Sequence, residues 1–274
     1  MKRKITKIFA LLLVCCAFVL AGCGDNSVNV NVDGNYKDTT KEAFSTYVAQ
    51  IDEAKNLDAK GYKFSMTYKT TINDEAGSKD SIAKELQNNY AFDSETSMNG
   101  KILSSEDGEA KNLSASFEIK TRLITDKSTQ EVKMNSYIKD GYFYTEMGGI
   151  KVKENLNALE GEDSIFQVLS VIPSKEEINS MLKQYAEGGT LDVKVAQSGD
   201  TAKYHLTVSI DDKEEGYSVS GDIYYVFKNG KFDGLKIILS SSAKGVSIDA
   251  TIDMISYDGT IDFPSFDEYI ETGV

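Results

Sequence analysis

Residues able to carry out nucleophilic, acid–base or metal chemistry are few in this sequence. Its 274 residues include one histidine, His205, and three cysteines, at positions 15, 16 and 23. A Ser-His-Asp or Cys-His centre needs a histidine beside a nucleophile, and no Gly-x-Ser-x-Gly elbow occurs. His205 alternates with Tyr204 and Leu206, so we expect it on the exposed face of a strand. A zinc site needs several His or Cys ligands, which this sequence does not supply.

The 43 acidic residues leave two other kinds of site to consider. A pair of carboxylates for glycoside hydrolysis stays open, but Asp249 and Asp253 alternate with apolar residues and are expected on a solvated sheet surface. Such sites also use tryptophan platforms, and the chain has no Trp. Residues 211–215 place four acids in one turn, but their spacing does not match an EF-hand loop. We therefore expect no enzyme, no cofactor and no metal.

The surroundings of Cys23 indicate a specific reaction. Four basic residues, at positions 2, 3, 4 and 7, precede an apolar run over 8–20, which ends in Leu20-Ala21-Gly22 before Cys23. This order is typical of a secretory signal peptide over residues 1–22. With its cysteine it resembles the lipobox of bacterial lipoproteins. That resemblance implies cleavage before Cys23 and a diacylglycerol anchor, with palmitate-like acyl chains, on its sulfur. The alternative is a plain secreted protein.

The net charge of the chain restricts the classes of partner that it can bind. The net charge is −13, and loss of residues 1–22 leaves 26 basic against 43 acidic residues, a net charge of −17. Such a chain is repelled by nucleic acid and by anionic head groups. Without the signal peptide, Arg122 is the one arginine and Cys23 the one cysteine, so neither a phosphate-binding surface nor a disulfide is expected. We expect the protein on the extracytoplasmic face of the cell membrane, lipid-anchored.

The organisation after Cys23 is predicted from composition and periodicity. Residues 23–38 are rich in Asn, Asp and Gly and predict a lipidated flexible tether, followed by one domain over 39–274. Three- and four-residue apolar spacing predicts a helix over 39–57, capped by Thr39 or Thr40, and helices over 163–171 and 174–187. The fold class expected is α+β, with a large antiparallel sheet that forms an incomplete β-barrel and about three covering helices.

Two-residue alternation predicts many strands. Asp140-Gly141 and Asn229-Gly230 are favoured hairpin turns. The aromatic residues of an acidic tail over 262–272 are expected to pack on the sheet. The strands are predicted at residues 62–72, 85–93, 97–104, 111–125, 131–139, 142–144, 150–153, 190–197, 201–211, 216–228, 231–243 and 246–258.

Aromatic and methionine side chains on these strands are the candidate ligand site. About three helices would leave part of so large a sheet uncovered. One expectation is therefore an apolar groove of the kind that accepts acyl chains. The alternative is that the same residues are ordinary core beneath the helices. The candidate lining residues are Phe64, Met66, Tyr68, Phe117, Ile119, Tyr142, Tyr144, Tyr225 and Phe227.

Several features together resemble the LolA/LppX-like superfamily, including its firmicute lipoprotein branches of unknown function. They are the lipobox, the polar tether, a leading helix that ends in Lys55-Asn56-Leu57, a Tyr/Phe/Met-rich strand, and Lys-Asp/Asn-Gly hairpins at 139–141 and 228–230. The resemblance covers most of residues 40–258. It implies a half-barrel with an apolar cavity and a membrane-anchored lipoprotein that binds a lipid or other hydrophobic ligand. The alternative is a non-catalytic scaffold with a filled core that binds another envelope protein.

Overall fold

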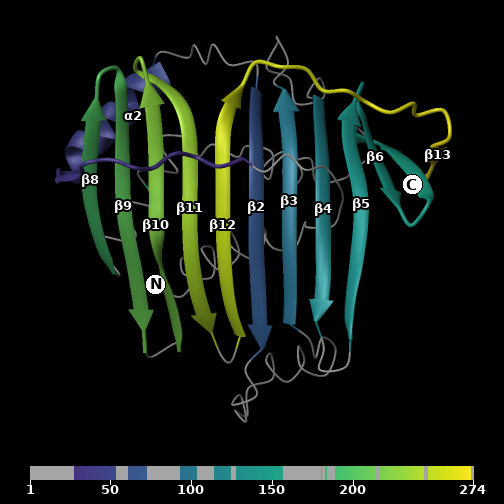
Figure 1. Ribbon diagram of the computed structural model, residues 1–274, viewed down its shortest axis with the longest axis horizontal. Helices are drawn as coiled ribbons and strands as arrows, with labels where there is room; N and C mark the ends of the chain where they lie inside the picture. The colour runs from purple at the N-terminus through teal and green to yellow at the C-terminus, as the bar shows by residue number, and fades with distance from the viewer. Residues whose placement is uncertain are drawn as a thin grey trace.

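The computed structural model describes residues 28–53, 61–72, 93–103, 114–124, 128–156, 180, 183, 189–213, 216–243 and 246–272. Within them the chain forms thirteen strands and one helix, drawn in Figure 1. In chain order they are β1 (Lys37–Asp38), α2 (Lys41–Glu53), β2 (Gly61–Ile72), β3 (Asp93–Leu103), β4 (Ser114–Ile124), β5 (Thr129–Lys139), β6 (Tyr142–Met147), β7 (Ile150–Asn155), β8 (Thr190–Ser198), β9 (Thr201–Asp212), β10 (Tyr217–Lys228), β11 (Lys231–Ala243), β12 (Val246–Tyr257) and β13 (Ile270–Glu271).

All thirteen strands belong to one open sheet, in the order β1-β8-β9-β10-β11-β12-β2-β3-β4-β5-β6-β7-β13. Neighbouring strands are antiparallel except β13, which pairs with β7 in parallel. The sheet is built from two meanders, β2–β7 and β8–β12, and the pairing of β2 with β12 joins them near its centre. The two short strands β1 and β13 each pair with two residues of the outermost long strands, so they cover only part of the two edges of the sheet.

The predicted fold class is therefore wrong. The structure is mostly β, with a single open sheet in place of an incomplete barrel, and α2 is the one helical element among the described residues. The predicted helices over 163–171 and 174–187 lie outside the described residues, apart from Ser180 and Lys183, which are helical. The prediction overestimated the share of helix, because the long alternating segments that form strands make up most of the described residues.

Most strand predictions agree with the structure. The strands of the last third start and end within about three residues of the predicted positions, whereas residues 85–92 lie outside the described part. At the predicted hairpin turns, Asp140 and Gly141 have φ of 52° and 78°, and Asn229 and Gly230 have 52° and 72°. Two consecutive positive φ angles are those of a type I′ turn, which Asp-Gly and Asn-Gly favour.

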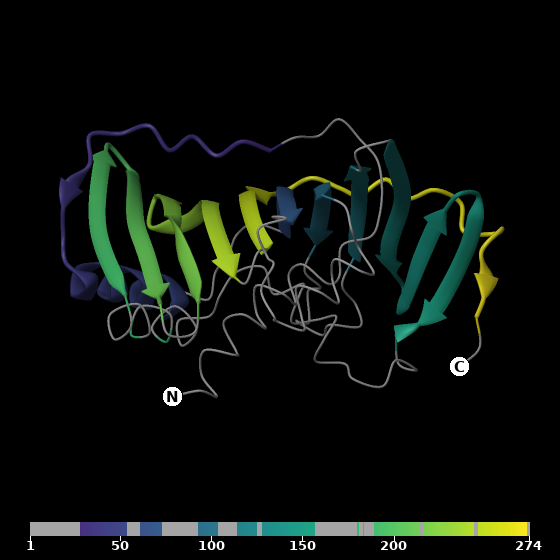
Figure 2. The same ribbon diagram turned by 90° about the horizontal axis from the view of Figure 1, so that it is seen from below.

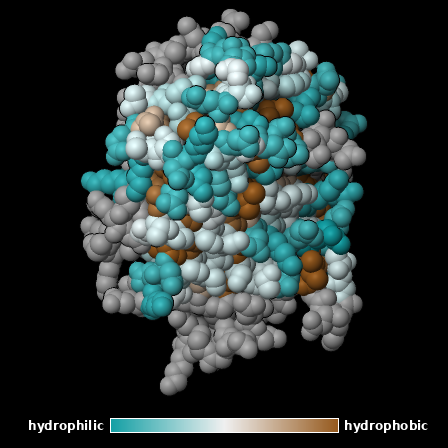
Figure 3. Space-filling model, turned by 60° about the vertical axis from the view of Figure 1, so that its left-hand side comes forward, coloured by the Kyte–Doolittle hydropathy of each residue, from teal (hydrophilic) through white to brown (hydrophobic). Residues whose placement is uncertain are grey.

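The two faces of the sheet differ in character. We call the face that carries Tyr204 and Leu206 the inner face, and the opposite one the outer face. Across β2–β5 the inner face carries no charged side chain, whereas all eleven charged side chains of these four strands are on the outer face. Figure 3, which brings the β8 end of the sheet forward, shows hydrophobic residues only as small separate patches among hydrophilic ones.

Helix α2 covers one end of the inner face. Thr40 caps it, because the Thr40 Oγ1 atom accepts a hydrogen bond of 3.0 Å from the amide of Ala43. Phe44 is fully buried, with its ring centroid 5.1 Å from that of Tyr204 and 5.3 Å from that of Tyr225. Tyr47 lies against Tyr204 as well. Figure 2 shows the helix beside β8–β10, on the side of the sheet opposite to residues 28–36.

We expect Phe44→Ala to lower the free energy of unfolding by about 3–5 kcal/mol, because it leaves a cavity among buried aromatic rings. Urea unfolding followed by far-UV circular dichroism measures this change. Thr46→Ala, two residues along the same helix at an exposed position, is the control and is expected to change stability by less than about 0.5 kcal/mol. Equal effects of the two substitutions would contradict the packing of α2 described above.

Candidate functional site

Seven of the nine predicted lining residues share the inner face. Phe64, Met66 and Tyr68 alternate along β2, and Phe117 and Ile119 follow on β4. Tyr225 and Phe227 are on β10, where Phe44 and Tyr47 of α2 cover them and leave 3% and 2% of each exposed. Tyr225 and Phe227 are therefore core residues. The remaining candidate residues for a ligand site on this face lie over β2–β5.

Tyr142 and Tyr144 are not part of this site, because they point to the outer face. Tyr144 stacks on Phe266 of the C-terminal segment with 3.8 Å between ring centroids and meets Tyr269 edge-on at 5.4 Å. Phe263 of the same segment meets Tyr137 of β5 edge-on at 6.3 Å, so the expectation that the aromatic residues of the tail pack on the sheet is confirmed. An ion pair of 2.7 Å between Lys151 and Glu268 holds the same segment against β7.

A glycine makes room for the aromatic rings at the centre of the inner face. Gly100 of β3 lies between Phe64 on one side and Phe117 on the other, whose ring centroids are 6.1 Å apart. A Cβ atom at position 100 would lie 2.6 Å from the Cζ atom of Phe64 and 3.0 Å from the Cδ1 atom of Phe117. The two rings therefore occupy the space that a side chain would fill, and they cover the glycine backbone.

Gly100→Val is expected to destabilise the protein by about 1–3 kcal/mol, since both rings must move to admit the branched side chain. Thermal and urea unfolding measure the change. A neighbouring position supplies the control: Asn99→Thr puts a β-branched residue on the outer face of the same strand, away from both rings. If the glycine variant proved as stable as the parent, the ring positions described here would be incorrect.

Methionine and aromatic side chains form a half-buried band across the inner face. Met66, Tyr68, Met98, Phe117 and Met134 are each partly exposed, and Met98, Tyr68 and Met134 surround the buried Ile119. Among the described residues, α2 packs on the inner face only at the β8–β10 end. Methionine is flexible and polarisable, and it adapts to apolar partners of different shape. This band is the candidate functional site.

The outer face is crossed by a segment that was predicted to be a flexible tether. Residues 28–36, which we call the strap, run across β12, β11, β10 and β9 to the β8 end of the sheet (Figures 1 and 2). Val28 and Val30 are 7% and 5% exposed. The chain then pairs as β1 with β8 and turns under that edge into α2. Residues 28–38 are thus packed on the sheet, and residues 23–27 lie outside the described part.

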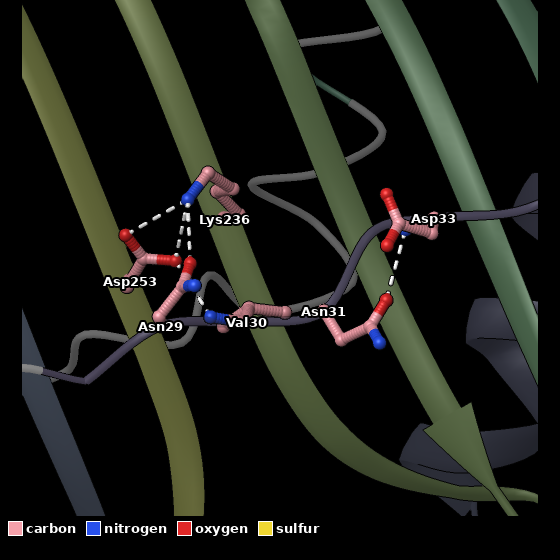
Figure 4. Close-up of polar contacts among 6 residues, drawn as sticks. All are labelled: Asn29, Val30, Asn31, Asp33, Lys236 and Asp253. Atoms are coloured by element: carbon pink, nitrogen blue, oxygen red, sulfur yellow. Dashed lines mark hydrogen bonds and ion pairs between the residues drawn. The ribbon is translucent and has the colours of Figure 1, made fainter.

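A buried ion pair fixes the strap to the sheet. The amide of Val30 donates a hydrogen bond of 2.8 Å to the Oδ1 atom of Asp253, and the Lys236 Nζ atom donates to the same oxygen at 2.9 Å (Figure 4). Lys236 also donates to the side-chain oxygen of Asn29 at 3.2 Å. Asp253 is 7% exposed, so its prediction as a solvated surface residue is wrong. Gly234, which has no side chain, lies beneath Val30.

Further contacts hold the rest of the strap. Lys203 donates to the Asn31 side chain at 3.1 Å and to the carbonyl of Asp33 at 2.8 Å. The Tyr36 hydroxyl donates to the carbonyl of Val32 at 2.7 Å. Burial, followed by the nearby Tyr224 and Asp33, raises the pKa of Tyr36 to about 12, so this hydroxyl keeps its proton at physiological pH. The alternation of Val with Asn over 28–32 was a strand-like signal that sequence reasoning had missed.

We expect Asp253→Asn to release the strap, because Lys236 would be left as a buried charge without its counter-ion. Hydrogen exchange of the Val30 amide should become at least tenfold faster, and stability should fall by about 3–5 kcal/mol. Asp249→Asn is the control: it lies on the same strand and face, and its partner is the exposed Ser240. Unchanged exchange at Val30 in the Asp253 variant would show that this ion pair does not hold the strap.

His205 lies on the outer face, as predicted, but it has partners there. Its Nε2 atom is 2.6 Å from the Oδ1 atom of Asp222, and the Thr207 hydroxyl donates to the same carboxylate oxygen at 3.1 Å. The imidazole stacks on Tyr224 with 4.2 Å between centroids, and Tyr36 of the strap meets it edge-on. The Thr207 hydroxyl is also 3.3 Å from the Nε2 atom. The ring contact with Tyr36 joins this cluster to the strap.

Metal ligands and cavities are the remaining features that could form a site. The described residues contain no group of three or more His, Cys, Asp or Glu side chains that could hold a metal ion. A hollow of about 500 Å³ lies where the strap turns into α2, lined by residues 38–42 and 191–194. Its lining is largely polar and it opens to solvent, so it is not the apolar groove that the sequence suggested. No helix in the described ranges is long and apolar enough to cross a bilayer.

Comparison with known proteins gives one distant likeness to report. No protein-family model and no curated protein matches the chain. Among solved structures, the chain is similar to LprF from Mycobacterium bovis, with a TM-score of 0.36 and 12% sequence identity. The likeness covers 84% of this chain and 99% of the LprF chain. A superposition at this score does not establish a common fold, and we draw no conclusion about function from it.

Proposed function

We propose that this protein is a lipoprotein anchored to the extracytoplasmic face of the membrane through Cys23, and that the inner face over β2–β5 binds the acyl part of a lipid or another hydrophobic ligand. The observation that carries the proposal is the absence of any charged side chain on the inner face of these four strands, combined with a half-buried methionine and aromatic band. The sequence resemblance to the LolA/LppX-like superfamily implies the same class of ligand.

A short length of acyl chain is enough to give a favourable binding free energy. Each methylene that leaves water for an apolar surface contributes about 0.8 kcal/mol. Six or seven methylenes against the band therefore contribute about 5 kcal/mol before the cost of immobilising the ligand is subtracted.

The experiment is native mass spectrometry of residues 24–274, purified from a bacterial host and then extracted with organic solvent. We expect a co-purified acyl lipid, or uptake of added phospholipid, in the parent protein. Met98→Glu should remove at least 90% of the bound lipid, because it places a charge in the apolar band. Ser97→Glu, the next residue on the opposite face of β3, should leave the lipid bound.

Circular dichroism and the unfolding midpoint establish that each variant is folded. Met98→Gln, which is uncharged and close in volume to methionine, is the second variant should Met98→Glu unfold, and we expect it to bind lipid at least fivefold more weakly. A parent protein that carries no lipid and takes up none would overturn the ligand proposal and favour a scaffold with a filled core.

A further inference from the structure

We propose that the outer face of β2–β5 is a docking surface for an anionic membrane, and that the anchored N-terminus and the strap hold it there. This inference rests on the proposed lipid anchor at Cys23, and it adds the orientation of the protein on the bilayer. Two independent observations carry it: the place where the strap begins, and the distribution of charge between the two faces.

The strap brings the anchor close to the centre of the outer face. Only four residues lie between Cys23 and Val28, and a fully extended chain over these five steps spans at most about 18 Å. The strap begins over β12, where Val30 bonds to Asp253 (Figure 4). In the strand order β12 is five strands from β1 and seven from β13. At about 4.8 Å between strands, the nearer lateral edge is therefore about 24 Å away.

This short connection restricts the orientation of the sheet. For the inner face to lie on the membrane, the chain would have to reach from the middle of the outer face around an edge of the sheet. Cys23 is seven residues, or at most about 25 Å, from Val30, so a path around either lateral edge is out of reach. The end of β12 at Tyr257 is about 13 Å from Asp253, and a path around this end would take up nearly the whole connection once the thickness of the sheet is added. The connection therefore favours the outer face, or the edge of the sheet beside Tyr257, as the side nearest the bilayer.

The charge of the outer face selects between these two. The strands β2–β5 themselves contribute seven basic and four acidic side chains to it, a net charge of +3 in a chain whose net charge is −13. The acidic C-terminal segment, which packs on Tyr137 of β5, is not part of this count. The basic residues are Lys63, Lys69, Lys101, Lys120, Arg122, Lys133 and Lys139. The acidic residues are Asp93, Glu95, Glu118 and Glu131. The expectation that anionic head groups repel this protein holds for its net charge but not for this face.

Like charges also stand directly opposite each other on this face. Lys63 pairs in register with Lys101, and Lys120 pairs with Lys133. Directly opposed like charges destabilise a sheet, so two such pairs on neighbouring strands need a compensating interaction. Lys120 and Lys133 each have a glutamate of their own strand within 4 Å, at 3.6 Å and 3.3 Å. Lys63 has no ion pair with any of the described residues.

One acid of the face contributes little negative charge to its surface. Glu118 is 7% exposed, and neither carboxylate oxygen accepts a hydrogen bond. At the β12 side of this surface, Asp249 of β12 stands opposite Lys69 of β2. The positive surface therefore begins at β2 and extends toward β5. The side chains of Arg122 and Lys133 are 51% and 53% exposed, and both can reach phosphate groups in front of the sheet.

The test uses the lipidated full-length protein, added to the outside of vesicles of phosphatidylglycerol and phosphatidylcholine or of phosphatidylcholine alone. Lipidation occupies the sulfur of Cys23, so an introduced cysteine is the one free thiol of the mature chain. Thr67→Cys places that thiol on the outer face of β2, and Gln130→Cys places it on the inner face of β5; both positions are exposed. The rate of labelling by a membrane-impermeant maleimide is measured for each.

We expect the Thr67→Cys thiol to react at least fivefold more slowly on the anionic vesicles than on phosphatidylcholine, and the Gln130→Cys thiol to react at one rate on both. Combining Thr67→Cys with Lys120→Glu and Lys133→Glu should restore fast labelling. The matched control combines it with Lys213→Glu and Lys228→Glu, two exposed lysines in the turns at either end of β10, and should keep the protection.

Each outcome decides the matter. Protein that floats with the vesicles but shows no protection of Thr67→Cys, or protection that survives the Lys120/Lys133 substitutions, overturns the orientation while leaving the anchor intact. Protein that lacks the lipid by mass and does not float overturns the anchor and the orientation together. The lipid ligand of the inner face is tested separately by the native mass spectrum of the soluble chain, so its failure and the failure of the docking surface are distinguishable.

Discussion

The separation of charge between the two faces of β2–β5 is the constraint on which the rest of the structure depends. Side chains alternate along a strand, so one face of a sheet can be wholly uncharged only if every strand keeps the same register. A shift of one residue in β3 would turn Glu95 and Lys101 to the inner face, among the aromatic and methionine side chains of β2. The cost of burying those charges holds the four strands in register, and the resulting inner face is apolar from β2 to β5.

The terminal segments complete the sheet at its two ends. The strap crosses the outer face and becomes β1 on one edge, and the C-terminal segment packs on Tyr144 and becomes β13 on the other edge. Both segments combine a buried aromatic or valine residue with a lysine–carboxylate pair, Lys236 with Asp253 and Lys151 with Glu268. Each pairs with two residues of the edge strand beside it, so they cover part of the edges of a sheet that does not close on itself.

Local features of this fold could be predicted from the sequence, whereas its long-range contacts could not. The alternation of β9–β12, the Asn229-Gly230 turn and the Thr40 cap each depend on neighbouring residues, and each was predicted. The strap was missed because its partners Lys203 and Asp253 are about 170 and 220 residues away along the chain. For the same reason Asp253 was assigned to the solvated surface, and Tyr142 and Tyr144 were grouped with residues of the opposite face.

The position of the strap also sets an order for folding. The strap is synthesised before every strand of the sheet, yet the residues that hold it, Lys203, Lys236 and Asp253, belong to β9, β11 and β12 near the end of the chain. The central pairing of β2 with β12 likewise joins residues about 185 positions apart. Contacts of such sequence separation form slowly. A growing chain therefore exposes the apolar residues of β2–β5 until its last strands are available, and docking of the strap is among the final events of folding.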